Sequence, residues 1–315
     1  MLADAARPLA GPRPYQQPGR MTAIATPVES LRLSPTTVAW REPGLLQVGL
    51  GEGSFCLADA PPEAPAIIAA LTRGRSPGEV RDLFPLVDAT ILQRLVEVVE
   101  SRGCLTADPL PAEVGLIGSG RLAQAIVRLL APEASVWVAD TSPRGARSAL
   151  PARRERWRAH AGGAPLRFAD HWHAALALPA DVVIVCPDTI EADRLQTDQL
   201  TRQGRAHLVV TAQAERAVVG PFVVPGSTAC VQCRDLARPD RREWGRFAAR
   251  LAHTRSPASP LLRQWAAAAA VAQVRAFLGG GVPDTAGGTL ELTAGGVLES
   301  GRWGIHEGCP CAGDW

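Results

Sequence analysis

The sequence predicts an α/β protein of two parts, a small helix-and-strand module over residues 31–108 and a larger parallel-sheet domain over residues 112–315. Two observations define the larger part. A short apolar strand leads directly into a glycine turn and a helix, and two widely separated cysteine pairs have the spacing of metal ligands. A third observation defines the smaller part, where short strands and amphipathic helices alternate and a proline-containing linker follows.

The composition is that of a soluble globular protein. Of the 315 residues, 46% are hydrophobic, and no apolar run reaches the ~20 residues of a membrane span. The longest alanine-rich helix, Trp265–Leu278, contains Gln273 and Arg275. No signal-type apolar segment stands near the N-terminus. We therefore expect a cytoplasmic protein without a membrane partner.

The first residues have a different composition from the rest. Residues 1–20 are rich in Pro, Ala and Gly, and we expect disorder over residues 1–30. Either Met1 or Met21 can be the first residue of the protein.

The basic residues are all arginine. The 33 residues counted as Lys plus Arg contain no lysine, and the chain also has no asparagine. Chemistry that needs a lysine amine or an asparagine amide is therefore excluded. The net charge of +2 argues neither for nor against a polyanionic partner. Two arginine-rich stretches, over residues 144–158 and 238–246, are either solvated surface or contacts for an acidic peptide or partner protein.

The small module reads as a winged-helix-type unit. Ser76, Pro77 and Glu79 form a capping-box pattern at the start of its second helix. The expected elements are the strands Leu45–Leu50 and Ser54–Ala58, the helices Ala64–Leu71, Pro77–Phe84 and Ala89–Arg102, and a returning strand Cys104–Thr106. The third helix offers Arg94 and Arg102 against three acids, too few cations for a DNA-recognition helix. We expect no nucleic-acid partner.

The element order and the run Arg75–Val80 resemble the PqqD-like recognition module of ribosomal peptide (RiPP) biosynthesis. That resemblance implies capture of a leader peptide by β-strand addition along Leu45–Ala58 and against the helix Ala89–Arg102. The candidate peptide-binding residues are Leu46, Val48, Leu50, Phe55, Leu92, Leu95 and Val99.

The glycine turn of the larger domain completes a βαβ fingerprint. Its parts are the strand Glu113–Ile117, the turn residues Gly118, Gly120 and Ala123, a helix to Leu130, the strand Val136–Ala139 and the acid Asp140. These parts in register predict a Rossmann-like fold. The glycines allow phosphate to approach the helix N-terminus, and Asp140 can bind a ribose hydroxyl, but the same glycines also serve strand–helix packing. Later parallel strands are expected at Asp181–Cys186 and Leu208–Thr211.

The cysteine pairs predict a metal site. Cys230 and Cys233 form C-x-x-C, and Cys309 and Cys311 form C-P-C near the C-terminus. Four thiolates complete a tetrahedral Zn²⁺ site with no open position, so the expected zinc is structural. A disulfide pair and unmetallated thiols are the alternatives.

The glycine turn, Asp140, Asp188, Arg194 and the cysteine pairs together resemble the ThiF/MoeB-like (ubiquitin-activating-like) adenylating family. The resemblance covers about residues 112–311 and implies a Mg-ATP site in which Asp188 and Arg194 are the catalytic candidates. The chain departs from the family pattern because it lacks the second acid, the asparagine and the lysine. Arginine does not replace a lysine point contact to phosphate without rebuilding the site. We therefore expect adenylation to be lost, and binding of ATP with Mg²⁺ stays an alternative.

A peptide-binding module joined to a degenerate ThiF-like domain resembles the leader-peptide-binding partners of cyclodehydratases that make thiazole- and oxazole-modified peptides. This resemblance implies a scaffold that presents a precursor peptide to a YcaO-type enzyme and forms a homodimer. An active adenylating enzyme is the main alternative. A dinucleotide-dependent oxidoreductase is another, but it leaves the cysteine pairs and the small module unexplained. A transcription factor is disfavoured by the charges of the third helix.

Overall fold

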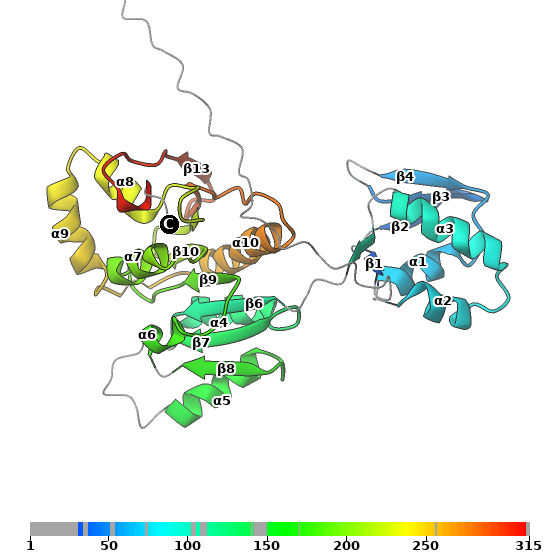
Figure 1. The fold of residues 1–315 in the computed structure, drawn as a ribbon, viewed down its shortest axis with the longest axis horizontal. Coiled ribbons are helices and arrows are strands. Elements are labelled where there is room, and N and C mark those ends of the chain that lie inside the picture. The colour runs from blue at the N-terminus through cyan, green and yellow to red at the C-terminus, as the bar shows by residue number, and fades with distance from the viewer. Residues whose placement is uncertain are drawn as a thin grey trace, which may run out of the picture. The chain divides into compact units, whose positions relative to one another are not determined.

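The computed structural model describes residues 31–33, 37–50, 54–72, 75–101, 105–107, 112–139, 141, 150–169, 171–255 and 257–312. The chain divides into two compact units, with the division at Leu110–Pro111 (Figure 1). The expectations for residues 1–30 and for Asp140 lie outside the described residues. None of the described helices is both long enough and apolar enough to cross a membrane.

The N-terminal unit contains two small sheets and three helices. Strands β2 (Val38–Glu42), β3 (Leu45–Val48) and β4 (Phe55–Ala58) form an antiparallel sheet in the order β2-β3-β4. Strands β1 (Leu31–Leu33) and β5 (Leu105–Ala107) pair with each other. The helices are α1 (Ala64–Thr72), α2 (Pro77–Leu83) and α3 (Ala89–Ser101).

The expected elements of this unit are present, and two strands were missed. The sequence did not indicate β2 because its residues are mostly exposed and do not alternate in polarity. The turn at Gly44, whose φ is +82°, joins β2 to β3. The capping box before α2 is confirmed, since the Glu79 N–H donates to Ser76 Oγ at 3.2 Å and the Ser76 N–H donates to Glu79 Oε2 at 2.8 Å.

The second unit is a Rossmann-like mixed α/β fold on one eight-stranded sheet, ordered β13-β12-β11-β10-β9-β6-β7-β8. The five strands from β10 to β8 in this order are parallel, and β11, β12 and β13 are antiparallel. The strands are β6 (Glu113–Ile117), β7 (Ser135–Ala139), β8 (Leu166–Ala169), β9 (Val182–Val185), β10 (His207–Ala212), β11 (Arg216–Val223), β12 (Gly288–Thr293) and β13 (Leu298–Arg302).

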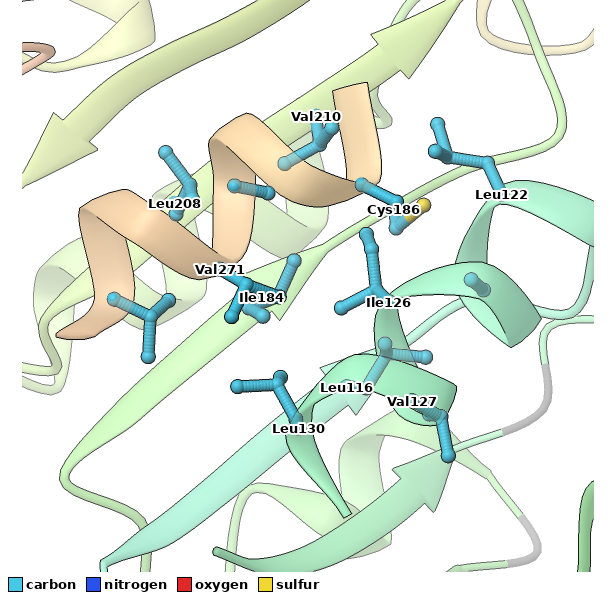
Figure 2. Packing of buried hydrophobic residues seen from close by; sticks show 14 of the residues in the cluster. Leu116, Leu122, Ile126, Val127, Leu130, Ile184, Cys186, Leu208, Val210 and Val271 are labelled. Atoms are coloured by element: carbon cyan, nitrogen blue, oxygen red, sulfur yellow. The ribbon is translucent and has the colours of Figure 1, made fainter. Parts of the chain in front are cut away.

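Helices cover both faces of this sheet. They are α4 (Arg121–Leu130), α5 (Leu150–His160), α6 (Trp172–Ala175), α7 (Arg194–Arg202), α8 (Val231–Ala237), α9 (Arg241–Leu251) and α10 (Pro260–Leu278). On one face, Ile126 of α4 and Val271 of α10 pack against Leu116, Ile184 and Leu208 of the strands (Figure 2). The buried alanines of α10 have short side chains, so this helix can approach the sheet closely.

The strand order reverses between β6 and β9. Strands β7 and β8 continue the sheet on one side of β6, and β9 and β10 continue it on the other side. The carboxyl ends of β6 and β9 therefore meet at the topological switch point, where open α/β sheets bind their ligands. The glycine turn follows β6 and Asp188 follows β9, so the fold itself brings the two together.

His207 makes the stability of this unit depend on pH. The ring is fully buried at the start of β10, and its Nε2 atom has no hydrogen-bond partner among the described residues. Burial lowers the pKa of His207 from 6.5 to about 4. As pH falls from 6.5 toward about 4, the His207 ring becomes protonated in the unfolded chain but stays neutral in the folded chain. Proton binding therefore favours the unfolded chain over this range, and the free energy of unfolding decreases.

We expect this residue to remove about 2 kcal/mol of unfolding free energy between about pH 7.5 and about pH 5. Denaturant unfolding of the native chain and of His207→Gln at both pH values measures the difference, which cancels the titration of every other group. Equal losses in the two proteins would contradict the assignment.

Candidate functional site

The carboxylate of Asp188 packs directly against the glycine turn at the switch point. A Cβ atom at Gly120 would lie 1.3 Å from Oδ1 of Asp188, and a Cβ at Gly118 would lie 2.2 Å from the carbonyl oxygen of Cys186. Both glycines are therefore required by the close approach of the segment that follows β9. Ala123 is fully buried and also faces this contact, which leaves room for only a small side chain.

Two hydroxyl groups extend this contact. The Ser119 hydroxyl donates to Asp188 Oδ2 at 3.1 Å, and the Thr141 hydroxyl lies 3.4 Å from Ser119 Oγ. Gly120 is the N-cap of α4 and supplies no side-chain cap, so a negative charge in front of the helix complements its exposed N–H groups. Asp188 thus places a carboxylate beside the turn at which this fold usually accepts a phosphate.

That position decides what the site can bind. A phosphate at the same helix N-terminus would meet the carboxylate as a like charge, unless a divalent cation stood between them. The sequence contains no lysine that could add a positive charge at this point. Asp188 can therefore either occupy the anion position itself or hold a Mg²⁺ ion with one carboxylate.

Arg194 begins α7, and its guanidinium group belongs to an ion-pair cluster. Its Nε atom donates to Asp235 at 2.7 Å, Nη2 donates to Glu191 at 3.1 Å, and Nη1 donates to the Ala192 carbonyl at 2.9 Å. Burial alone would lower the pKa of Arg194, but the carboxylates of Asp235 and Glu191 raise it above its ordinary value. The charge of Arg194 is neutralised within this cluster, which joins α7 to α8.

The four predicted cysteines lie together and are all buried. Their Sγ atoms all lie within 4.8 Å of one another. Cys230 and Cys309 are 3.5 Å apart, Cys233 and Cys311 are 3.2 Å apart, and Cys230 and Cys233 are 3.8 Å apart. Sulfurs at about 2.3 Å from one tetrahedral ion are about 3.8 Å from each other. The cluster therefore has the dimensions of a metal site, and it can hold a metal ion.

The chemistry of the thiols supports the same conclusion. Hydrogen bonds from the Cys230 thiol and from the backbone N–H of His306 lower the pKa of Cys233 to about 4. Burial and the hydrogen bond with Cys233 raise the pKa of Cys311 to about 12. The hydrogen bond to Cys233 also raises the pKa of Cys230. One thiolate therefore suppresses the ionisation of its neighbours, and a bound cation would allow them to ionise together.

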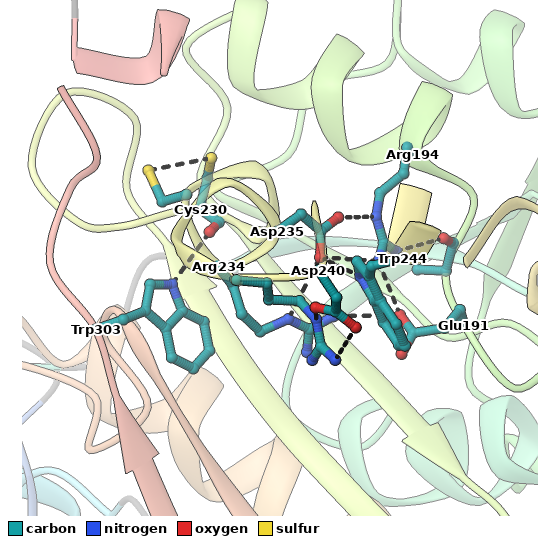
Figure 3. A network of polar contacts seen from close by, with 11 residues as sticks. Glu191, Arg194, Cys230, Arg234, Asp235, Asp240, Trp244 and Trp303 are labelled. Carbon is teal, nitrogen blue, oxygen red and sulfur yellow. Dashed lines mark hydrogen bonds and ion pairs between the residues drawn. The ribbon is translucent and has the colours of Figure 1, made fainter. Parts of the chain in front are cut away.

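The cysteine cluster is continuous with the ion-pair cluster (Figure 3). The Trp303 indole N–H donates to the Cys230 carbonyl at 3.2 Å, and the Arg234 guanidinium lies 5.9 Å from the centre of the Trp303 ring. Arg234 then contacts Glu191 at 3.3 Å. The C-terminal segment is thus joined through α8 to the residues that follow β9.

The candidate peptide-binding residues are placed mostly in the core of the N-terminal unit. Leu50 is 76% exposed, and the side chain of Val99 lies outside the described residues. The buried members are Leu46, Val48, Phe55, Leu92 and Leu95. A side chain in this core can shape a groove but does not present itself to a peptide. The exposed positions of the same elements, such as Ile91 at 43%, were not selected from the sequence.

Several residues of these clusters were missed by sequence reasoning. Ser119 stands between the two glycines, and its hydrogen bond to Asp188 gives it a role in the site. Asp235 and Trp244 are close to Arg194 only in the fold, because their partners lie on other helices. A Ser inside a G-x-G turn is the one signal that was readable beforehand.

No family model matches the chain, and no curated protein matches it in sequence. Solved structures do match. E. coli MccB is 12% identical with a TM-score of 0.53, over 91% of this chain and 97% of that chain. The Microcin C7 biosynthetic enzyme MccB in complex with N-formylated MccA is 13% identical with a TM-score of 0.54, over 90% of this chain and 100% of that chain.

A heterocyclase in complex with substrate and cofactor is 16% identical with a TM-score of 0.56, over 91% of this chain but 40% of that chain. At these identities the likeness shows the fold. This chain therefore has the fold of MccB and of part of the heterocyclase.

The cysteine cluster gives a direct prediction. Elemental analysis of the purified protein is expected to find about one metal ion per chain. Cys309→Ser is expected to lower both the metal content and the melting temperature, because it removes one thiolate and leaves the C-terminal segment less firmly attached. Cys56→Ser, at an exposed cysteine of the other unit, is the matched control and is expected to change neither. Full metal content in Cys309→Ser would count against this ligand set.

Proposed function

We propose that this protein is a leader-peptide-binding scaffold of RiPP biosynthesis. The N-terminal unit binds the leader of a ribosomally made precursor peptide, and the ThiF-like unit presents the complex to a YcaO-type cyclodehydratase. The observation that carries the proposal is a combination within one chain. The fold of MccB is matched over about nine tenths of the chain, while the chain contains no lysine or asparagine to contact a triphosphate.

Two features of the N-terminal unit support peptide binding by strand addition. Within the described residues, β4 pairs only with β3, so its outer edge offers backbone N–H and C=O groups to an extended peptide. Helix α3 packs into the same hydrophobic cluster as β4, and its Ile91 is exposed. A peptide along β4 would receive hydrogen bonds from the strand and apolar contact from α3.

The comparisons support a peptide as the ligand class. MccB has been solved in complex with N-formylated MccA, and the heterocyclase has been solved in complex with its substrate. The matched regions in this chain include both units, because they cover 90% and 91% of its length. The assignment of a peptide ligand to this chain rests on that shared architecture together with the open edge of β4.

The non-catalytic role is supported by the residues at the switch point. Asp188 lies across the glycine turn, Arg194 is engaged by two carboxylates, and no lysine exists to contact a triphosphate. Adenylation depends on neutralising phosphate charge around an in-line attack, and this chain has no lysine for that purpose. Thioester chemistry is also disfavoured at Cys186, because burial raises the pKa of its thiol well above the ordinary value.

An ATP-dependent adenylating enzyme is the second candidate, and one observation favours it. Asp188 keeps a carboxylate at the switch point, where it can bind Mg²⁺ with ATP, and MccB has been solved with ATP. In that case Asp188 would hold the cation, and the glycine turn would open to admit the phosphates.

Zinc is the metal that we propose for the cysteine cluster. Four buried thiolates suit Zn²⁺ and leave no open position for water, so the ion would be structural. It would attach the segment with Cys309 and Cys311 to α8. We further propose a cytoplasmic protein, where thiols stay reduced, and a homodimer, as the ThiF resemblance implies.

The test is calorimetric titration of the full chain with the leader peptides encoded beside its gene. The native chain is expected to bind one of them with a Kd in the micromolar range or tighter. Ile91→Asp is expected to raise that Kd at least about tenfold, because it places a charge in the proposed groove. Leu195→Asp, at an exposed leucine on α7 of the other unit, is the control and should leave the Kd unchanged. Absence of binding by the native chain, or native affinity in Ile91→Asp, would contradict the proposed groove.

A further inference from the structure

Helix α9 carries a row of arginines on its surface. Arg242, Arg246 and Arg250 recur every four residues, and all three are exposed. At 1.5 Å of rise per residue, neighbours in this row are about 6 Å apart along the helix axis. The helix contains four arginines and one glutamate, so its surface has a local excess of positive charge although the whole chain is nearly neutral.

These arginines differ from the arginines of the neighbouring helices α7 and α8. Arg194, Arg234 and Arg238 each have a carboxylate partner, at 2.7, 3.3 and 2.9 Å. Across the part of the chain that the structure describes, no ion pair involves Arg242, Arg246 or Arg250. The three guanidinium groups of the row are therefore available to solvent or to a partner.

A cavity and an exposed aromatic ring lie at the same helix. Trp244 and Leu251 of α9 line a cavity of about 400 Å³ whose wall also includes Arg216 and Arg238. Arg238 stacks 4.1 Å above the Trp244 ring. Phe247 contacts Trp244 edge-on and is 52% exposed. The helix thus combines cations with aromatic surface, the combination that anchors peptides at interfaces.

We propose that α9 is a docking surface for an acidic peptide segment. Alternate side chains of an extended peptide recur about every 6.6 Å, close to the spacing of the arginine row. Carboxylates at alternate positions would each meet one guanidinium, and an apolar side chain beside them would cover Phe247. A nucleic acid is the less suitable partner, because the basic surface is one helix wide and the chain has a net charge of only +2.

This surface goes beyond the proposed leader site, because it lies in the other unit and uses side-chain charge in place of a strand edge. Its test therefore needs no leader peptide. Failure of docking at α9 would leave leader binding at β4 untouched, and the reverse also holds.

The experiment uses the full chain and a fluorescein-labelled alternating Glu-Ser peptide of about ten residues. Fluorescence anisotropy is expected to give saturable binding at low salt that weakens as salt is added. The double variant Arg246→Gln/Arg250→Gln is expected to raise the Kd at least about tenfold. The control Arg128→Gln/Arg202→Gln removes the same charge from exposed last-turn arginines of α4 and α7, and should retain native affinity.

Three further arms complete the experiment. An alternating Gln-Ser peptide should not bind, and Phe247→Ala should weaken binding of the Glu-Ser peptide without changing the far-ultraviolet circular dichroism. The proposal is overturned if the Glu-Ser peptide does not bind, or if both double variants lose affinity equally. It is also overturned if an oligodeoxythymidylate of similar length binds α9 more tightly than the acidic peptide does.

Discussion

The contact between Asp188 and the glycine turn is the constraint on which the rest of the second unit depends. The reversal of strand order places the ends of β6 and β9 side by side, and the turn after β6 must then pass the segment after β9 without side chains. Gly118 makes room for the Cys186 carbonyl, and Gly120 makes room for the Asp188 carboxylate. Packing at this contact therefore requires both glycines, whether or not the site binds a nucleotide.

The same segment leads from the switch point into the ion-pair cluster. Glu191 follows Asp188 by three residues and receives both Arg194 and Arg234. Arg234 belongs to α8, and its guanidinium lies over the ring of Trp303, whose indole N–H donates to the Cys230 carbonyl. Burying ion pairs of this kind costs desolvation free energy. Removing one partner costs more, because it leaves the other charge partly buried and uncompensated. A metal at the cysteines would hold one end of this chain of contacts, and the glycine turn holds the other.

The parts of this architecture that local patterns determine were predictable. The strand, turn and helix from Glu113 to Leu130 follow from periodicity and from glycine placement, and the observed α4 ends at the predicted residue. The spacing of the cysteines predicted their cluster, because thiolates in two close pairs serve one ion. The capping box before α2 was readable for the same reason, since all its partners lie within four residues.

What the sequence left undetermined depends on contacts between distant residues. Arg194 looked like a catalytic arginine, yet its partner Asp235 is brought close only by the packing of α8. Leu46 and Leu92 have the periodicity of a buried face, and a sequence does not distinguish the core side of such a face from a groove that admits a ligand. Strand β2 has too little alternation to be recognised without its partner β3.

The central proposal is that the chain has the fold of MccB without adenylation chemistry. The most direct measurement is exchange of labelled pyrophosphate into ATP by the native chain, with Mg²⁺ and a saturating leader peptide present. We expect no exchange above that of a protein-free reaction, because the chain has no lysine or asparagine to contact the triphosphate and the Asp188 carboxylate lies against the glycine turn. Exchange that requires a peptide carboxylate, and that disappears in Asp188→Ala, would contradict it.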